Sequence, residues 1–192
     1  MRIHLRRRGV PLAVSLVLVS LGPSSAAAEW FVGGFAGSTA GGLLDKTKAM
    51  SGVRGGYWLT DWVGGELRAA GVPRALEVDG MPDLVLRSSI STETFNLLIA
   101  PLGHRRSMAP YAAIGFGRIH THEDVGTRSA DNENLAVEIG GGVQGRLAGP
   151  VGWHVEARYE RDTGTFIAGP GLAVPGPTFW GLTAGALVTF GR

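Results

Sequence analysis

Two histidines and two acids lie close together near the middle of the chain, as His120, His122, Glu123 and Asp124. In an extended strand, His120 and His122 lie on the same face because side chains alternate with a period of two. Imidazole and carboxylate groups suit a divalent metal ion, and a histidine near an acid can serve as the base of a hydrolase. The simplest interpretation is a solvated, charged strand end, which we favour over a metal site and over hydrolysis.

A second set of charged residues occupies alternate positions in segments with the periodicity of β-strands. The set holds four bases and four acids, on the face opposite the apolar residues. A buried charge without a partner costs several kcal/mol, so the balanced signs predict ion pairs inside the fold. The functional alternative is a charged pore, but a barrel of about eight strands has little room for a water channel. The predicted network consists of Arg54, Glu66, Arg68, Glu138, Arg146, Glu156, Arg158 and Glu160.

Residues 140–145, GGGVQG, match the dinucleotide-binding pattern G-x-G-x-x-G. That pattern requires a strand before it and a helix that opens on it, whereas these glycines lie inside an alternating strand. Glycine leaves space for long charged neighbours in a narrow interior. We therefore predict a structural role for the glycines and no cofactor.

The stretch 134–162 positions many of these charges. Its apolar residues recur at every second position on both sides of the break Ala148-Gly149-Pro150, which predicts a β-hairpin. The face with glycine and charge suits a narrow interior, so the apolar face is predicted to point into lipid, as is typical of a transmembrane β-barrel. The apolar face holds Leu135, Val137, Ile139, Val143, Leu147, Trp153, Val155, Ala157 and Tyr159.

Eight such segments are predicted after residue 28, joined alternately by long and short links. Outer-membrane barrels have short turns on the periplasmic side and long loops outside. We therefore predict an all-β fold, an eight-stranded antiparallel up-and-down transmembrane β-barrel with both termini in the periplasm. The predicted strands are 30–38, 52–59, the segment from 63, 87–101, 111–121, 134–147, 151–162 and 179–190, with the faces of 30–38 undetermined. The predicted long loops are 39–50, 73–86, 122–133 and 163–178, the last too rich in proline and glycine for a strand.

Aromatic residues concentrate at the strand ends that this topology places on the periplasmic side. An aromatic ring favours the membrane interface because one end is apolar and the other is wet. The predicted interface aromatics are Trp30, Tyr57, Trp62, Tyr111, Trp153 and Phe190.

Residues 1–28 have a basic start, a short apolar centre and a small-residue exit, which predicts a cleaved secretory signal peptide. The apolar part is too short for the roughly 20 residues of a membrane helix. Residues 29–192 then form one barrel domain with 14 bases and 16 acids, a formal charge of −2, so the sequence gives no support for nucleic-acid binding. There is no cysteine, which excludes disulfides and thiolate sites.

The strands resemble the small outer-membrane β-barrel family, of the type of the transmembrane domain of outer membrane protein A and the opacity-like surface proteins. The resemblance rests on residues 30–34 (WFVGG), 52–57 (GVRGGY), 110–117 (PYAAIGFG) and the ending Gly185-x-x-Val188-x-Phe190. It implies a Gram-negative outer membrane, with outer-membrane lipid and lipopolysaccharide as neighbours. It also implies insertion by the barrel-assembly machinery, although Gly191 and Arg192 follow the usually terminal aromatic.

The family includes structural, adhesive and enzymatic members on one scaffold. Similar barrels that deacylate lipid A carry a His-x-Ser pair with an acid, but His122 stands at the serine position after His120, and the nearest serine is Ser129. The leading interpretation is a non-enzymatic structural or surface barrel whose loops meet an unknown extracellular ligand. A lipid A-modifying acyl hydrolase and a small channel are the alternatives. The apolar segment 163–178 is either an adhesive patch or a cap over the barrel mouth.

Overall fold

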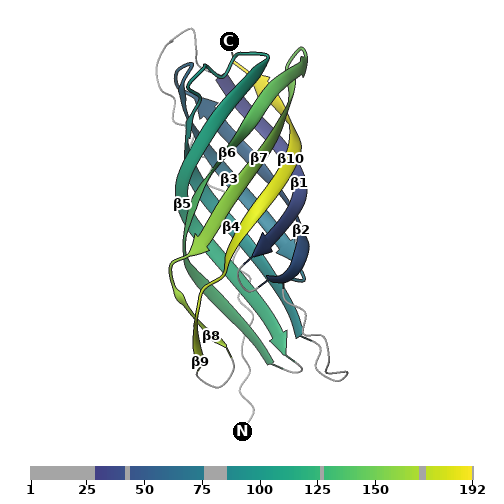
Figure 1. The fold of residues 1–192 in the computed structure, drawn as a ribbon, viewed down its shortest axis with the longest axis vertical. Helices are drawn as coiled ribbons and strands as arrows, with labels where there is room; N and C mark the ends of the chain where they lie inside the picture. Colours follow the sequence, from purple (N-terminus) through teal and green to yellow (C-terminus); the bar gives the residue numbers. More distant parts are fainter. Residues whose placement is uncertain (1–28, 42–43, 76–85, 126–127, 169–171, 192) are drawn as a thin grey trace.

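The computed structural model describes residues 29–41, 44–75, 86–125, 128–168 and 172–191, and these form strands and short turns (Figure 1). The predicted signal peptide lies outside the described residues. The part of the chain that the structure describes contains no helix long and apolar enough to cross a membrane. The strands are β1 (Glu29–Gly41), β2 (Leu44–Trp58), β3 (Val63–Pro73), β4 (Leu86–Ile99), β5 (Met108–Val125), β6 (Arg128–Ala148), β7 (Val151–Asp162), β8 (Thr165–Ala168), β9 (Leu172–Pro175) and β10 (Thr178–Phe190).

Eight of these strands close into one antiparallel barrel, in the order β1-β10-β7-β6-β5-β4-β3-β2. The barrel closes where β1 pairs with β10, from Trp30 opposite Phe190 to Ala40 opposite Trp180. Each remaining pair joins wall strands that follow one another in the chain, β7 and β10 being separated by the β8–β9 hairpin, so the sheet closes on itself around the barrel. The predicted eight-stranded up-and-down barrel is confirmed.

One end of the barrel holds Glu29, Phe190 and the three short turns, and we call it the terminal end (top in Figure 1). The opposite end, where β1 leads to β2 and β5 to β6, is called the far end. The turn between β6 and β7 contains Gly149 at φ 54°, a left-handed conformation that glycine adopts without steric cost. This is the turn that the sequence predicts at Ala148-Gly149-Pro150.

The outer surface of the wall is apolar. Phe95, Leu97, Phe116 and Ile139, for example, are large, exposed side chains on neighbouring strands, and the alternation that the sequence predicts places them all on the outside. In β1, whose faces the sequence leaves open, Trp30 and Val32 point outward while Phe31 and Phe35 are buried inside. The exterior is therefore a continuous apolar belt, which requires lipid rather than water around it.

The interior is layered. A cluster of buried apolar residues fills the far end and a second fills the terminal end, with charged residues between them. The far-end cluster consists of Phe35, Leu44, Met50, Ala70, Val72, Ala75, Ile90, Ile119, Ala136 and Phe179. The terminal-end cluster consists of Phe31, Trp58, Leu98, Ala100, Tyr111 and Ala113.

Three of the predicted long loops are wrong. β1 and β2 continue through most of 39–50, and β5 and β6 continue through most of 122–133, leaving only 42–43 and 126–127 between the described strands. The polar residues there mark where the wall leaves the apolar belt and not where it ends, because the strand ladder still satisfies their backbone. In 163–178, the strands β8 and β9 pair as a separate hairpin. The remaining loop, 73–86, contains residues 76–85, which lie outside the described residues.

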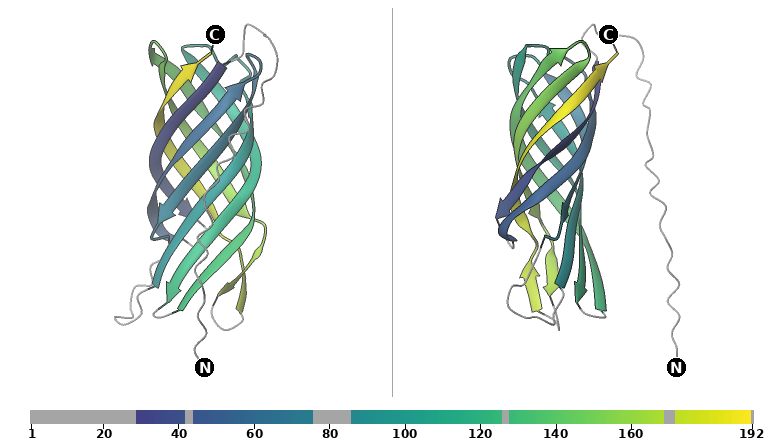
Figure 2. Two further views of the ribbon diagram at one scale, coloured as in Figure 1. Left: turned by 180° about the vertical axis from the view of Figure 1, so that it is seen from behind. Right: turned by 90° about the vertical axis from the view of Figure 1, so that its right-hand side faces the viewer.

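Figure 2 shows that the wall reaches furthest at the far end, along β5 and β6, next to the β8–β9 hairpin. The hairpin leaves the wall after Asp162, whose Oδ1 accepts a hydrogen bond from the Gly164 amide (2.6 Å) and whose Oδ2 accepts one from Asn134 Nδ2 (2.9 Å). These contacts fix the point at which β7 ends and the hairpin begins.

Candidate functional site

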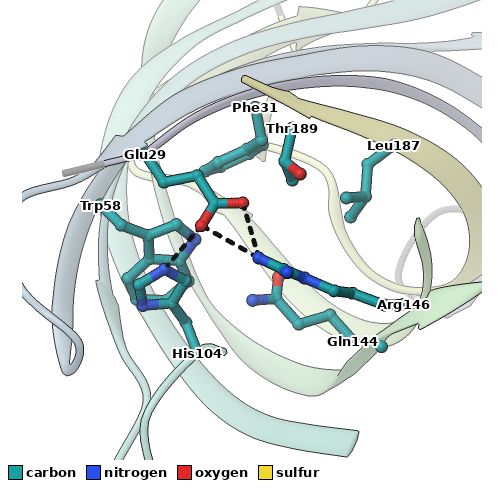
Figure 3. Close-up of a pocket in the computed structure, with 9 residues that line it drawn as sticks. Glu29, Phe31, Trp58, His104, Gln144, Arg146, Leu187 and Thr189 are labelled. Atoms are coloured by element: carbon teal, nitrogen blue, oxygen red, sulfur yellow. Dashed lines mark hydrogen bonds and ion pairs between the residues drawn. The ribbon is translucent and has the colours of Figure 1, made fainter. Parts of the chain in front are cut away.

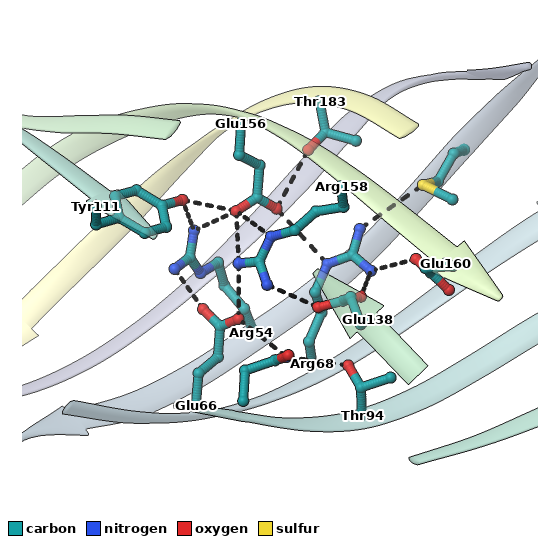
Figure 4. Close-up of polar contacts among 12 residues, drawn as sticks. Arg54, Glu66, Arg68, Thr94, Tyr111, Glu138, Glu156, Arg158, Glu160 and Thr183 are labelled. Atoms are coloured by element: carbon teal, nitrogen blue, oxygen red, sulfur yellow. Dashed lines mark hydrogen bonds and ion pairs between the residues drawn. The ribbon is translucent and has the colours of Figure 1, made fainter. Parts of the chain in front are cut away.

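The centre of the lumen holds a network of charged side chains contributed by β2, β3, β6 and β7 (Figure 4). Arg158 is its hub. Its Nη1 lies 2.6 Å from Glu138 Oε1, and its Nη2 lies 3.0 Å from Glu66 Oε1 and 2.8 Å from Glu156 Oε2. One guanidinium thus joins carboxylates from three strands, using donors that are fixed in one plane.

Arg54 extends the network toward the terminal end. It pairs with Glu66, and its Nη1 lies 3.1 Å from Glu156 Oε2. The same Nη1 donates to the hydroxyl of Tyr111 (2.9 Å), which donates to Glu156 Oε2 (2.6 Å). Glu156 also accepts from Thr183 Oγ1 (3.3 Å), so its carboxylate is held by groups on β2, β5, β7 and β10.

Arg68 extends the network toward the far end. Its Nη1 lies 3.0 Å from Glu138 Oε2 and 2.8 Å from Glu160 Oε1. Its guanidinium carbon lies 4.5 Å from the centre of the Phe35 ring, a cation–π distance. The arginine therefore connects the charged middle to the far-end apolar cluster.

Seven of the eight charges predicted from the sequence belong to this network, and their side chains are between 0 and 1% exposed. They are three arginines and four glutamates. Buried apolar clusters lie on both sides of them along the lumen, and the charges themselves are removed from water, so they must be satisfied largely by one another. The arrangement is a solid plug of ion pairs.

Arg146 is the eighth predicted member, and the structure places it elsewhere. It lies at the terminal end, where its Nη2 is 3.0 Å from Glu29 Oε1 (Figure 3). Glu29 also lies 3.5 Å from His104 Nε2, and the His104 ring stacks on Trp58 at 4.6 Å with an interplanar angle of 5°. Arg146 therefore lines a small pocket at the barrel mouth. The sequence did not indicate Glu29 or His104, because their link to Arg146 depends on pairing around the barrel.

Tyr111 is not an interface aromatic, so that prediction is wrong. The residue is 5% exposed, and it faces the lumen because β5 directs its odd-numbered residues inward. Its hydroxyl finds buried partners in Arg54 and Glu156, which offset the cost of burying a polar group. The other predicted interface aromatics lie on the outer face at the terminal end, namely Trp30, Tyr57, Trp62, Trp153 and Phe190.

His120 and His122 lie on the outer face of β5, beyond the apolar belt. Each contacts a carboxylate on β6. His120 Nε2 lies 3.5 Å from Glu133 Oε2, and His122 Nδ1 lies 2.6 Å from Asp131 Oδ1. The side chains of Glu123 and Asp124, the other predicted members of this cluster, lie outside the described part of the structure. Among the described residues, no group of three histidine or acidic side chains could hold a metal ion.

A closed antiparallel wall, apolar outside and charged inside, defines a transmembrane β-barrel protein. No protein-family model matches the sequence, and no curated protein matches it significantly. Solved barrels do match its structure. Neisserial surface protein A superposes with a TM-score of 0.64 at 14% identity, covering 85% of this chain and 99% of that chain.

Two further solved outer-membrane barrels also match the structure of this chain. Outer membrane protein OprG from Pseudomonas aeruginosa gives a TM-score of 0.58 at 19% identity, covering 86% of this chain and 97% of that one. Ail, the attachment invasion locus protein of Yersinia pestis, gives 0.54 at 14% identity, covering 85% and 99%. The chain has the fold of the small eight-stranded outer-membrane β-barrels.

Proposed function

We propose that the protein is an outer-membrane barrel with a structural or surface-interaction role, exported through a cleaved signal peptide at residues 1–28. Its neighbours in the membrane would be outer-membrane lipid and lipopolysaccharide, and the barrel-assembly machinery would insert it. The observation that carries the proposal is the buried lumen, in which the side chains of the ion-pair network are at most 1% exposed and lie between two buried apolar clusters. A barrel filled in this way is a rigid anchor.

The far end supports a surface role. The outer face changes from apolar to charged at Arg118, whose guanidinium pairs with Glu93 (2.9 Å) and Glu133 (3.3 Å). β5 and β6 continue beyond this level, at about 3.4 Å per residue, and the β8–β9 hairpin lies at the same end. Rigid scaffolds commonly present recognition surfaces on such projections. We propose that the partner of this surface is an extracellular molecule.

The structural neighbours agree with this role by analogy alone. One of them is named a surface protein, and Ail is named for attachment and invasion and has been solved with the heparin analogue sucrose octasulfate. One fold supports many activities, so we propose only the shared role, a barrel that anchors a projecting surface.

The proposed orientation can be tested with single cysteines, because the natural chain has none. Ser129, next to the β5–β6 connection, and Ser107, in the turn before β5, are both exposed. In intact cells, a membrane-impermeant maleimide is expected to label the Ser129→Cys variant. The matched Ser107→Cys variant should be labelled only after the outer membrane is permeabilised. The reverse labelling pattern would mean that the barrel has the opposite orientation in the membrane. Recovery of both variants as soluble protein, without a mobility shift on boiling, would exclude a membrane barrel.

The sealed lumen predicts that the purified barrel does not conduct. In planar bilayers we expect no stepwise current above that of the lipid alone, because the described side chains of the network are at most 1% exposed and lie between two buried apolar clusters. A sixteen-stranded porin in the same bilayers provides the positive control. Discrete, reproducible steps from the barrel would instead support a small channel through the charged lumen.

A further inference from the structure

The outer segment of β6 has a neighbouring strand on one side only. β5 pairs with β6 from Arg128 onward, whereas β7 first pairs with β6 at Ala136. The last described contact on the β7 side is Leu135 O, which accepts a hydrogen bond from the Thr163 amide (2.9 Å). Among the described residues, no strand pairs with the β7 side of residues 128–134, and we call this side the open edge.

The backbone groups of alternate residues point at the open edge. Successive residues of a strand direct their N–H and C=O groups to opposite sides, and Leu135 O points toward β7, so the odd-numbered residues before it point the same way. The β5 side agrees, because Val143 lies opposite Pro110, which has no N–H and suits a pair without hydrogen bonds. The backbone groups at the open edge belong to Ser129, Asp131 and Glu133.

The β8–β9 hairpin does not fill the open edge. A straight continuation of β7 would pair with it, but the chain turns away at Gly164, whose amide donates to Asp162 Oδ1 (2.6 Å). β8 then pairs with β9 in a separate two-stranded sheet (Figure 1). The described structure therefore leaves a segment of about seven residues, roughly 20 Å long, to which another strand can be added.

The outward face of this segment is acidic. The carboxylates of Asp131 and Glu133 contact the two histidines of β5, yet the Asp131 side chain is still 81% exposed and the Glu133 side chain 48%. A second copy of the same edge would set acids against acids, and like charges directly opposite each other are destabilising. Charged side chains on edge strands commonly prevent such self-pairing. The acidic face therefore favours a basic partner over a second copy.

We propose that the open edge binds an extended segment of an extracellular polypeptide as an added antiparallel strand, with lysine or arginine at every second residue. In this mode of recognition, main-chain hydrogen bonds give affinity and alternate side chains give specificity. The basic residues lie opposite Asp131 and Glu133, and they are also the residues that exchange backbone hydrogen bonds with β6. The inference rests on the proposed function, which places the far end outside the cell, and it adds the chemistry of the partner.

The test uses the full barrel in nanodiscs of phosphatidylcholine and a capped octapeptide of four Lys-Thr repeats, with binding measured by titration calorimetry. N-methylation of the four lysine amides should weaken binding by at least about 10-fold, because these N–H groups face β6. N-methylation of the four threonine amides should retain binding, since those groups face away. The two methylated peptides have the same composition and charge, so equal affinities would overturn the proposal.

Two substitutions of Asp131 separate charge from backbone pairing. Asp131→Ala removes the carboxylate and should weaken peptide binding by about 2–5-fold. Asp131→Pro also removes the N–H at the open edge and should weaken it by a further factor of about 10. That N–H is not bonded to β5, and edge strands accept proline, so both variants should keep the mobility shift on boiling. Equal binding by the two variants would contradict strand addition.

Hydrogen exchange distinguishes the possible occupants of the edge. The amides of Asp131 and Glu133 should exchange rapidly in the free barrel and become protected when the octapeptide binds. Protection in a free monomer would mean that the hairpin fills the edge, and protection in a dimer seen by sedimentation would mean that a second copy does. Either result would overturn the proposal.

The cysteine-labelling experiment reads the proposed orientation separately. Correct labelling without binding of the Lys-Thr peptide would reject strand addition and leave the proposed orientation intact. Reversed labelling would reject the orientation, and with it an extracellular partner, even if the peptide binds.

Discussion

Replacement of Arg158 by alanine is expected to destabilise the barrel by about 3–5 kcal/mol, the range for removing one partner from a buried ion pair. Arg158 joins Glu66, Glu138 and Glu156, and the alanine variant would leave these carboxylates with fewer donors in a lumen closed to water. The measurement is the free energy of unfolding in lipid vesicles from urea titration, followed by the loss of the mobility shift on boiling.

Arg161 provides the control, because it lies on the same strand three residues further along and its side chain faces outward and is exposed. Arg161→Ala should change the free energy of unfolding by no more than about 0.5 kcal/mol, as is usual for surface sites. Equal effects of the two substitutions would mean that water enters the lumen and solvates the carboxylates. In that case the plug would not be sealed, and the channel alternative would gain support.

Much of the wall could be predicted from sequence because one physical rule governs it. Lipid outside and a narrow interior require every strand to alternate, and Val155, Glu156, Ala157 and Arg158 show the alternation directly. Strand β1 was harder to orient, since its glycines carry no side chain to mark a face. Its facing follows from closure of the barrel, where β1 pairs with β10, a contact between the two ends of the sequence.

The strand lengths could not be predicted, because a polar stretch of sequence is compatible with two structures. A polar stretch can be a loop, or it can be a strand that has left the membrane. Residues such as Thr121 and Asn132 are polar, yet they pair directly across β5 and β6. Where a strand has left the lipid, apolar residues no longer have to occupy every second position. The sequence therefore has no periodic signal there, even though the strand pairing continues.

The residues of the candidate sites were also only partly predictable from the sequence. The charges of the network could be found because each lies on the inner face of its own strand. The contact of Tyr111 with the network, and the position of Arg146 away from it, depend on how far each strand is shifted relative to its neighbours around the barrel.

The position of the apolar belt leads to the second large expected effect. Val155 faces outward on β7, midway along the belt between Trp153 at the terminal end and Tyr159. An arginine on the lipid face of a barrel costs about 2–4 kcal/mol at the bilayer midplane and about 0–1 kcal/mol near the interface. Val155→Arg should therefore lower the free energy of unfolding in vesicles by the larger amount.

Val151→Arg is the matched control, because Val151 lies on the same strand and the same face but beside the turn at the terminal end, where arginine can reach the polar head groups. Its expected cost is about 0–1 kcal/mol. The difference in free energy of unfolding between the two variants measures the effect of depth in the bilayer, because the strand, the face and the substitution are the same. If Val151→Arg cost as much as Val155→Arg, the belt would extend past the turn. If both were neutral in vesicles, this face of β7 would not contact lipid, and the charged face of the wall would have to be the outer one.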